Sequence, residues 1–134
     1  MTESAPITVH DVMTPQPAMI DGLATVREAV EIMREKKFSS LIIKKRDVDD
    51  EYGMVSMPEI ARQVIEPDLS IDRTSVYQVM VKPVLSVDGH MNIRYAIRLL
   101  SRYGETRALV LEQGIAVGIV TLRDMVFRYI EDRL

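Results

Sequence analysis

VREAVEIM at residues 26–33 returns as IRYAIRLL at residues 93–100, and this recurrence decides the fold. GMVS at residues 53–56 returns in the same way as GIVT at residues 118–121. The offset between matching residues stays between 65 and 68 along the chain. Such a period is too long for a common solenoid repeat and too short for two ordinary domains. The sequence therefore predicts two half-domains that pack around a pseudo-two-fold axis, with a small-ligand cleft to which both halves contribute walls.

The two repeats are expected to share one order of elements, β-α-β-β-α, and so to form an α/β (α+β) fold. We place the first repeat at residues 1–66, a linker at 67–75 and the second repeat at 76–134. A strand, a helix and a strand in succession favour a parallel pair with a crossover, and the hairpin adds an antiparallel neighbour. In the first repeat we expect helices at 26–36 and 56–65 and strands at 38–43 and 52–55. In the second repeat we expect a helix at 93–103, strands at 109–111 and 115–120, and a last helix from 121.

The composition is that of one compact domain with an ordinary core. The chain has 134 residues, of which 47% are hydrophobic and 28% are charged, and it contains no cysteine. This excludes a disulfide framework and a thiol nucleophile. No apolar run approaches the roughly 18 residues of a membrane span, and residues 1–4 lack a signal-peptide pattern. We therefore expect a cytoplasmic protein without a membrane partner.

The charge pattern and the histidines argue against two further classes of function. A net charge of −3 gives no general attraction to nucleic acid, although residues 34–46 are basic and Phe38 offers a stacking group. We expect Phe38 to be buried, which argues against a nucleic-acid role, because a buried ring cannot stack on a base. His10 and His90 are isolated, lack metal-ligand spacing and are expected at the surface or in turns. No nucleophile–base pair is visible, so we expect neither a metal site nor catalysis.

Two junctions between a strand and a helix carry the residues of greatest chemical interest. Ser56 is followed three residues later by Glu59, and Thr121 is followed in the same way by Asp124. Each pair fits a capping box, which stabilises a helix start by about 1 kcal/mol and needs no ligand. The same groups also suit a nucleoside phosphate, because free N–H groups favour phosphate and a carboxylate accepts hydrogen bonds from a ribose diol. The spacing alone leaves both interpretations open.

The order of these motifs resembles a tandem pair of CBS (cystathionine-β-synthase) domains, a stand-alone Bateman module. The resemblance rests on the opening VMTP at residues 12–15, the strand ending GIVT at residues 118–121, and the Thr-x-x-Asp that opens the last helix. It extends from about residue 9 to residue 130. It implies an adenosine-containing ligand, typically AMP, ADP or ATP, in the cleft between the repeats. No cofactor is required.

The resemblance also assigns residues to this nucleotide-binding site. Asp124 would hold the ribose hydroxyls, Thr121 would contact the ribose or phosphate, and Ile119 would press on the base. Arg107 would face the phosphate. The remaining contributions would come from Thr14, Ala18, Met19, Phe38 and Ser39.

A possible second cleft, at Ser56 and Glu59, departs from the family pattern. Glu59 replaces the aspartate, Pro58 lies inside the motif, and the opening threonine is lost in MVKP at residues 80–83. Lys37 lies in the basic stretch that could attract a phosphate. We expect this cleft to be degraded or to have another specificity, with Ser56 and Glu59 acting as a plain capping box.

The sequence thus predicts a regulatory module that senses an adenine nucleotide, and with it the energy state of the cell. It does not distinguish AMP, ADP or ATP from NAD or S-adenosylmethionine, and it does not name the regulated protein. The alternative is a ligand-free module for homodimerisation. The residues expected on its helical dimer face are Ile97, Leu100, Met125 and Tyr129.

Overall fold

The computed structural model describes residues 5–134, which form two compact units. The first unit is Ala18–Val84, and the second unit joins the residues up to Pro17 with Leu85–Leu134. Each unit therefore contains most of one repeat and the opening segment of the other. The repeat boundaries at 1–66, 67–75 and 76–134, and their packing around a pseudo-two-fold axis, stay predictions.

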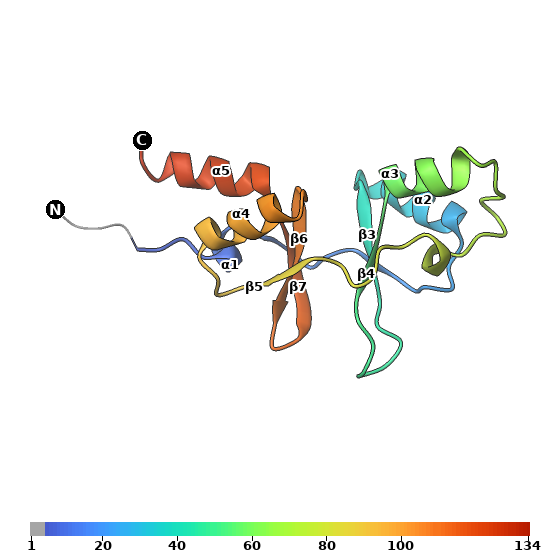
Figure 1. Ribbon diagram of the computed structural model, residues 1–134, viewed down its shortest axis with the longest axis horizontal. Helices are drawn as coiled ribbons and strands as arrows, with labels where there is room; N and C mark the ends of the chain where they lie inside the picture. Colours follow the sequence, from blue (N-terminus) through green and yellow to red (C-terminus); the bar gives the residue numbers. More distant parts are fainter. Residues whose placement is uncertain (1–4) are drawn as a thin grey trace. The chain divides into compact units, whose positions relative to one another are not determined.

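The first unit contains a three-stranded sheet in the order β2-β3-β4. β2 (Met19–Ile20) runs parallel to β3 (Ser40–Ile43), and β3 runs antiparallel to β4 (Gly53–Ser56). Helix α2 (Val26–Lys36) connects β2 with β3, as the crossover rule predicts. Figure 1 shows α2 and α3 (Met57–Ile60) on the same side of the β3–β4 hairpin. A 3₁₀ turn, η2 (Val76–Gln78), completes the unit.

The start of α2 is a complete capping box, which fits the Thr-x-x-Glu pattern at residues 25–28. The backbone N–H of Glu28 donates to the Thr25 hydroxyl at 3.2 Å, and the Thr25 N–H donates to the Glu28 carboxylate at 3.3 Å. Apolar residues at helical spacing, Val26, Ala29 and Met33, are buried on the inner face of this helix. Local sequence signals are therefore sufficient for this element.

Three expectations about the first repeat are wrong. The strand predicted to begin at Phe38 begins at Ser40, and the Phe38 side chain is 43% exposed rather than buried. The single helix expected at 56–65 is a short α-helix followed by a π-helix, η1 (Ala61–Ile65). The hydroxyl of Ser56 makes no cap hydrogen bond. Pro58 explains the last difference in part, because it has no N–H to donate to that hydroxyl.

The second unit contains a four-stranded sheet in the order β1-β7-β6-β5. β5 (Ser86–Asp88) and β6 (Arg107–Glu112) are parallel, and β7 (Ile115–Thr121) is antiparallel to both β6 and β1 (Thr14–Pro15). Its helices are α1 (Val9–Val12), α4 (Ile93–Arg102) and α5 (Leu122–Glu131). The core is formed by apolar residues of these helices and strands, among them Ile93, Ala96, Leu100, Val110, Val120 and Met125. The α/β fold class and the repeated order of elements are confirmed.

Candidate nucleotide-binding site

The second unit brings five of the predicted site residues to the end of β7 and the adjoining start of α5. Thr14 on β1 is the register partner of Ile119 on β7, and Arg107 on β6 is the partner of Thr121. Ile119 and Thr121 lie two residues apart on one strand, so their side chains point to the same face of the sheet. Asp124 follows in the first turn of α5. The sheet register therefore places a hydroxyl, a guanidinium and a carboxylate around one strand end.

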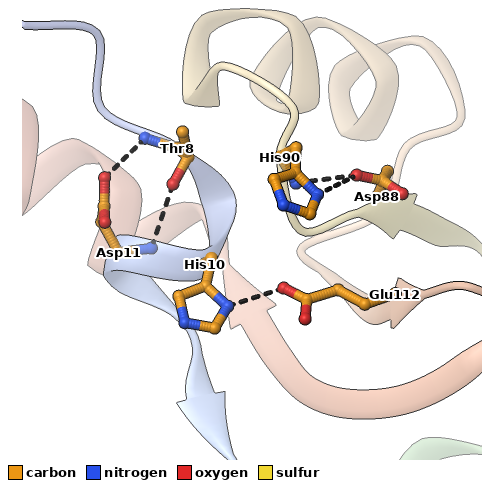
Figure 2. Close-up of polar contacts among 6 residues, drawn as sticks. All are labelled: Thr8, His10, Asp11, Asp88, His90 and Glu112. Carbon is orange, nitrogen blue, oxygen red and sulfur yellow. Dashed lines mark hydrogen bonds and ion pairs between the residues drawn. The ribbon is translucent and has the colours of Figure 1, made fainter.

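The start of α5 differs from the capping boxes at Thr25 and Thr8, which also end in an acidic residue. The Thr121 hydroxyl accepts a hydrogen bond from the Asp124 N–H at 3.1 Å. In the boxes at Thr25 and Thr8, the acidic side chain also accepts the cap residue's N–H, with the Asp11 carboxylate at 2.9 Å from the Thr8 nitrogen (Figure 2). Within residues 5–134, no such return bond to Asp124 is present. The half-buried Asp124 carboxylate therefore keeps its acceptor capacity for a ligand.

Arg107 and Thr14 differ in their exposure. Arg107 begins β6 and is half-buried, beside the backbone of Thr121. Thr14 is exposed at the edge of the sheet, because β1 is its last strand. A guanidinium such as that of Arg107 can donate hydrogen bonds to phosphate oxygens, and a hydroxyl such as that of Thr14 can exchange hydrogen bonds with ribose hydroxyls.

The other predicted residues of the site belong to the first unit. The N–H of Ile42 donates to the Ala18 carbonyl at 2.9 Å, and Met19 is the register partner of Ile42. The Ser39 carbonyl accepts the N–H of Met57 at 3.1 Å, which fixes Phe38 and Ser39 beside the start of α3. These four residues thus lie along the entrance and the first strands of their own sheet. Their union with Asp124 in one site stays a prediction.

At the possible second cleft, the bonds of a capping box are missing and the Glu59 carboxylate is already paired. Glu59 accepts hydrogen bonds from Arg62 at 2.9 Å and from Gln63 at 2.7 Å, both one turn later in the same segment. The capping box expected between Ser56 and Glu59 is therefore wrong. Lys37 is exposed and ends α2 in the left-handed conformation, with φ 59°. The specificity of this cleft stays a prediction.

Both histidines are exposed, as expected, and each lies beside a carboxylate (Figure 2). Nδ1 of His10 is 2.6 Å from the Glu112 carboxylate, and Nδ1 of His90 is 3.2 Å from that of Asp88. Across residues 5–134, no three His, Cys, Asp or Glu side chains are placed to hold one metal ion. The same part of the chain has no helix with the length and apolar character needed to cross a bilayer.

A comparison with known protein families identifies both repeats. The family model of the CBS domain matches the chain twice, at residues 9–66 and 76–131. The chain belongs to the CBS domain family. The hexameric CBS-CP12 protein from bloom-forming cyanobacteria is 31% identical, with a TM-score of 0.85 over 93% of this chain and 73% of that one. An uncharacterized conserved protein from Pyrococcus horikoshii shares the fold, with 23% identity, a TM-score of 0.81 and 95% of both chains covered.

Three curated relatives of the CBS domain chain are between 24% and 26% identical to it. The CBS domain-containing protein YhcV of Bacillus subtilis is 26% identical over 118 residues, which are 88% of this chain and 82% of YhcV. Uncharacterized proteins of Methanopyrus kandleri and Thermofilum pendens are 26% and 24% identical, and the match spans only 57% and 43% of their lengths. The chain thus spans about half the length of these last two relatives. The resemblance inferred from the sequence is confirmed at the level of the family.

Sequence reasoning missed one group of charged residues. Asp50, expected in a hairpin tip, forms ion pairs with both Arg46 and Lys82. Lys82 is distant in sequence, so no local pattern could indicate the pair. The alignment of the two repeats gives no help either, because the residues at this edge of the sheet differ between the repeats.

Proposed function

We propose that this CBS domain chain is a regulatory module that binds an adenine nucleotide, AMP, ADP or ATP, and thereby reports energy state. The observation that carries the proposal is the Asp124 carboxylate, which has no return bond from Thr121 in its own cap. A half-buried carboxylate beside a hydroxyl is suited to accept hydrogen bonds from the two hydroxyls of a ribose. The family relationship supports the same class of ligand.

The other groups have separate roles in this proposal. Arg107 pairs with the phosphate, and the positive end of the dipole of the ten-residue α5 adds to this attraction. Ile119 contacts the base, and Thr121 contacts ribose or phosphate. The residues proposed to complete the site are Thr14, Ala18, Met19, Phe38 and Ser39.

Thermal unfolding against AMP, ADP and ATP tests the proposal. A ligand at a hundred times its Kd stabilises the native state by about 2.7 kcal/mol, which is a shift of several degrees at this size. We expect Asp124→Ala to abolish the shift. Glu59→Ala is the matched control, because it removes the acidic residue of the corresponding junction, where the carboxylate is already paired. A shift that persists in Asp124→Ala would contradict the assignment of the site.

Nucleotide sensing also implies a protein that receives the signal, and we propose that the chain acts on such a partner and not as an enzyme. Binding couples to regulation only if the ligand has unequal affinity for two states of the module. Nucleotides incubated with the protein should be recovered chemically unchanged. Recovery of a hydrolysed or transferred product would contradict this part of the proposal. A cytoplasmic location stays a prediction.

One observation favours the alternative function, homodimerisation. Arg94 and Ile97 of α4 and Val126, Tyr129 and Ile130 of α5 line a shallow hollow of about 240 Å³. The Val126 and Ile130 side chains are 47% and 50% exposed. The expectation that Leu100 and Met125 contribute to this face is wrong, because both are fully buried in the core.

Sedimentation velocity tests the dimer face directly. We expect Val126→Asp to shift the protein toward monomer, since a dimer would bury that carboxylate without a partner. The control is Val48→Asp, which places the same charge on an exposed loop valine. An unchanged dimer in Val126→Asp, or a monomeric parent protein, would remove the basis of this alternative.

A further inference from the structure

The first unit has a large hollow at the end of its sheet opposite to Phe38 and Ser39. It measures about 490 Å³ and lies where the parallel strands β2 and β3 end. The segments that line it are Asp21–Leu23 after β2, Ile43–Arg46 at the end of β3, Tyr77 in η2, and Met80 and Lys82 after η2. We call it the Lys44 hollow. Carboxyl ends of parallel strands are a general place for ligand binding in α/β sheets.

The Lys44 hollow is strongly basic. Its lining contains four cationic side chains, Lys44, Lys45, Arg46 and Lys82, and one carboxylate, Asp21. Asp21 accepts the Leu23 N–H at 2.8 Å, and with its negative charge counted the four cations of the lining still exceed it by three. The acidic loop residues that follow, Asp47, Asp49 and Glu51, are not part of the lining. The excess of positive charge favours an anion.

Two of the four cations are held in place by one carboxylate. Asp50, whose side chain is only 6% exposed, forms an ion pair with Lys82 and accepts the Arg46 backbone N–H at 2.8 Å and its Nε at 3.3 Å. Lys82 above all, and then the Arg46 N–H, hold the pKa of Asp50 well below its usual range. One negative charge cannot neutralise two cations, so this group keeps a net positive charge; Lys82, with a side chain that is 25% exposed, is the more firmly held of the two, since the Arg46 side chain is 82% exposed. Such ordering reduces the cost of binding an anion.

The rest of the lining is apolar. Ile43 and Met80 form the inner part, and the exposed side chains of Leu23 and Tyr77 stand at the rim. Apolar walls with a few convergent charges are typical of sites for small organic molecules.

The second repeat provides an internal comparison, because the matching residues are 67 positions away. The N–H of Tyr77 donates to the Gly22 carbonyl at 3.1 Å, and the N–H of His10 donates to the Gly89 carbonyl at 2.8 Å. The backbones therefore correspond, but the side chains do not. Leu23 and Lys45 match His90 and Glu112.

At the corresponding edge of the second unit, a side-chain contact crosses between the elements. His10 on α1 reaches Glu112 at the end of β6, as Figure 2 shows. In the first unit the residues at these positions are Tyr77 and Lys45, and the Lys45 ammonium lies 4.9 Å from the centre of the Tyr52 ring instead. At the same backbone edge, the second unit thus has a histidine–carboxylate contact, whereas the first unit has a basic hollow.

We propose that the Lys44 hollow binds a small organic anion, whose carboxylate or phosphate pairs with Lys44, Arg46 and Lys82 while its apolar body lies against Tyr77, Ile43 and Met80. This site lies within the first unit and shares no residue with the candidate nucleotide-binding site. It is therefore a second ligand site, independent of Asp124.

Amide chemical shifts of the ¹⁵N-labelled full chain test the proposal. The probes are phenyl phosphate and benzoate, with inorganic phosphate and benzyl alcohol as compounds that carry only the anion or only the ring. We expect an aromatic anion to shift the amides of Gly22, Leu23, Lys44 and Tyr77. The two aromatic probes distinguish a phosphate from a carboxylate ligand by their relative affinity.

Lys44→Gln is the decisive variant, because Lys44 is exposed and its loss leaves the Asp50 ion pairs intact. We expect it to weaken binding about fivefold, since it removes a charge-assisted contact in a partly solvated site. The matched control is Lys36→Gln, which removes the same charge from the end of α2. Asp124→Ala should leave the affinity unchanged.

Four outcomes would overturn the proposal. They are no shift of the four amides at millimolar probe, an equal loss of affinity in Lys36→Gln, binding of inorganic phosphate as tight as that of phenyl phosphate, and loss of binding in Asp124→Ala. The last would place the probe at the nucleotide site. A failure of nucleotide binding in the thermal assay has no bearing on these measurements.

Discussion

Gly118→Ala should destabilise the protein, because the neighbouring strand β1 lies very close to β7 at this glycine. Gly118 is buried, and a Cβ added to it would lie 2.6 Å from the Met13 sulfur and 2.7 Å from the Thr14 carbonyl oxygen. The sulfur ends a flexible side chain and can move, but the carbonyl belongs to the backbone of β1. An ordinary contact begins near 3.4 Å, so β1 must move by about 0.7 Å.

The expected loss of stability follows from this overlap. Overpacking of this kind costs about 1–3 kcal/mol, and the reduced freedom of the unfolded chain returns about 0.4–1 kcal/mol. The net loss of about 1–2 kcal/mol lowers the midpoint of thermal unfolding by about 4–7 °C in a chain of 134 residues. Circular dichroism at a fixed protein concentration measures it.

Two other glycines form a graded series with Gly118. At Gly22 the nearest atoms to an added Cβ are side-chain carbons at 3.4 and 3.5 Å, so Gly22→Ala should change the midpoint little. At Gly53 the nearest backbone atom is the Val81 carbonyl oxygen at 3.3 Å, so the effect should be intermediate. If Gly118→Ala unfolds at the same temperature as Gly22→Ala, the close approach of β1 does not constrain the fold and the reasoning is refuted.

Two further predictions concern single side chains. Thr25→Ala should lower the free energy of unfolding by about 1 kcal/mol in urea, whereas Ser56→Ala should change it by less than about 0.5 kcal/mol, because only Thr25 makes the cap bond; equal losses would show that the Ser56 hydroxyl does cap α3. The ion pairs lower the pKa of Asp50 in the folded state, so their stabilisation is complete above about pH 4 and is lost as the pH falls below it. Asp50→Asn should therefore reduce the midpoint of thermal unfolding at pH 7, and its difference from the parent protein should shrink toward pH 2; a difference that is constant with pH would contradict the ion-pair role.

Helix starts were predictable where the signals lie within a few residues of one another. The Thr25 box and the Asn92 cap, whose side chain accepts the Arg94 N–H at 2.9 Å, follow from side chains that bond their own turn. The apolar spacing after each cap then fixes the buried face, as at Val26 and Met33. Distant carbonyls also accept N–H groups of these first turns, Thr74 from Val26 and Ile7 from Ile93, but the local cap bonds form beside them, so sequence reasoning succeeded.

The assignment of the opening segments to units was not predictable from the repeat. Val9 donates to the Met91 carbonyl at 2.8 Å, and Val76 donates to the Ala24 carbonyl at the same distance. Each opening segment thus pairs with the repeat that it does not precede. The offset between repeats is the same for either pairing, so the sequence pattern carries no information on the choice.

The candidate site was predictable as a motif but not as a set of bonds. Thr25 with Glu28 and Thr121 with Asp124 both fit the spacing of a capping box, yet the return bond forms at Glu28 and not at Asp124. That difference depends on the conformation of a side chain and on its surroundings, which spacing does not encode. It is also the difference on which the proposed nucleotide site rests.

The two repeats give one backbone edge two different chemistries, and this bears on how such a chain can hold two ligands. Hydrogen bonds from Tyr77 and His10 to matching glycine carbonyls keep the edge the same in both units. Because the backbone is fixed by these bonds, the side chains at the matching positions are free to diverge without cost to the fold. Lys45 in one repeat and Glu112 in the other reverse the charge at a single position. A duplicated unit can therefore accommodate both sites that we propose, the nucleotide site at Asp124 and Arg107 and the anion site at Lys44, and variants of each should leave the other ligand's affinity unchanged.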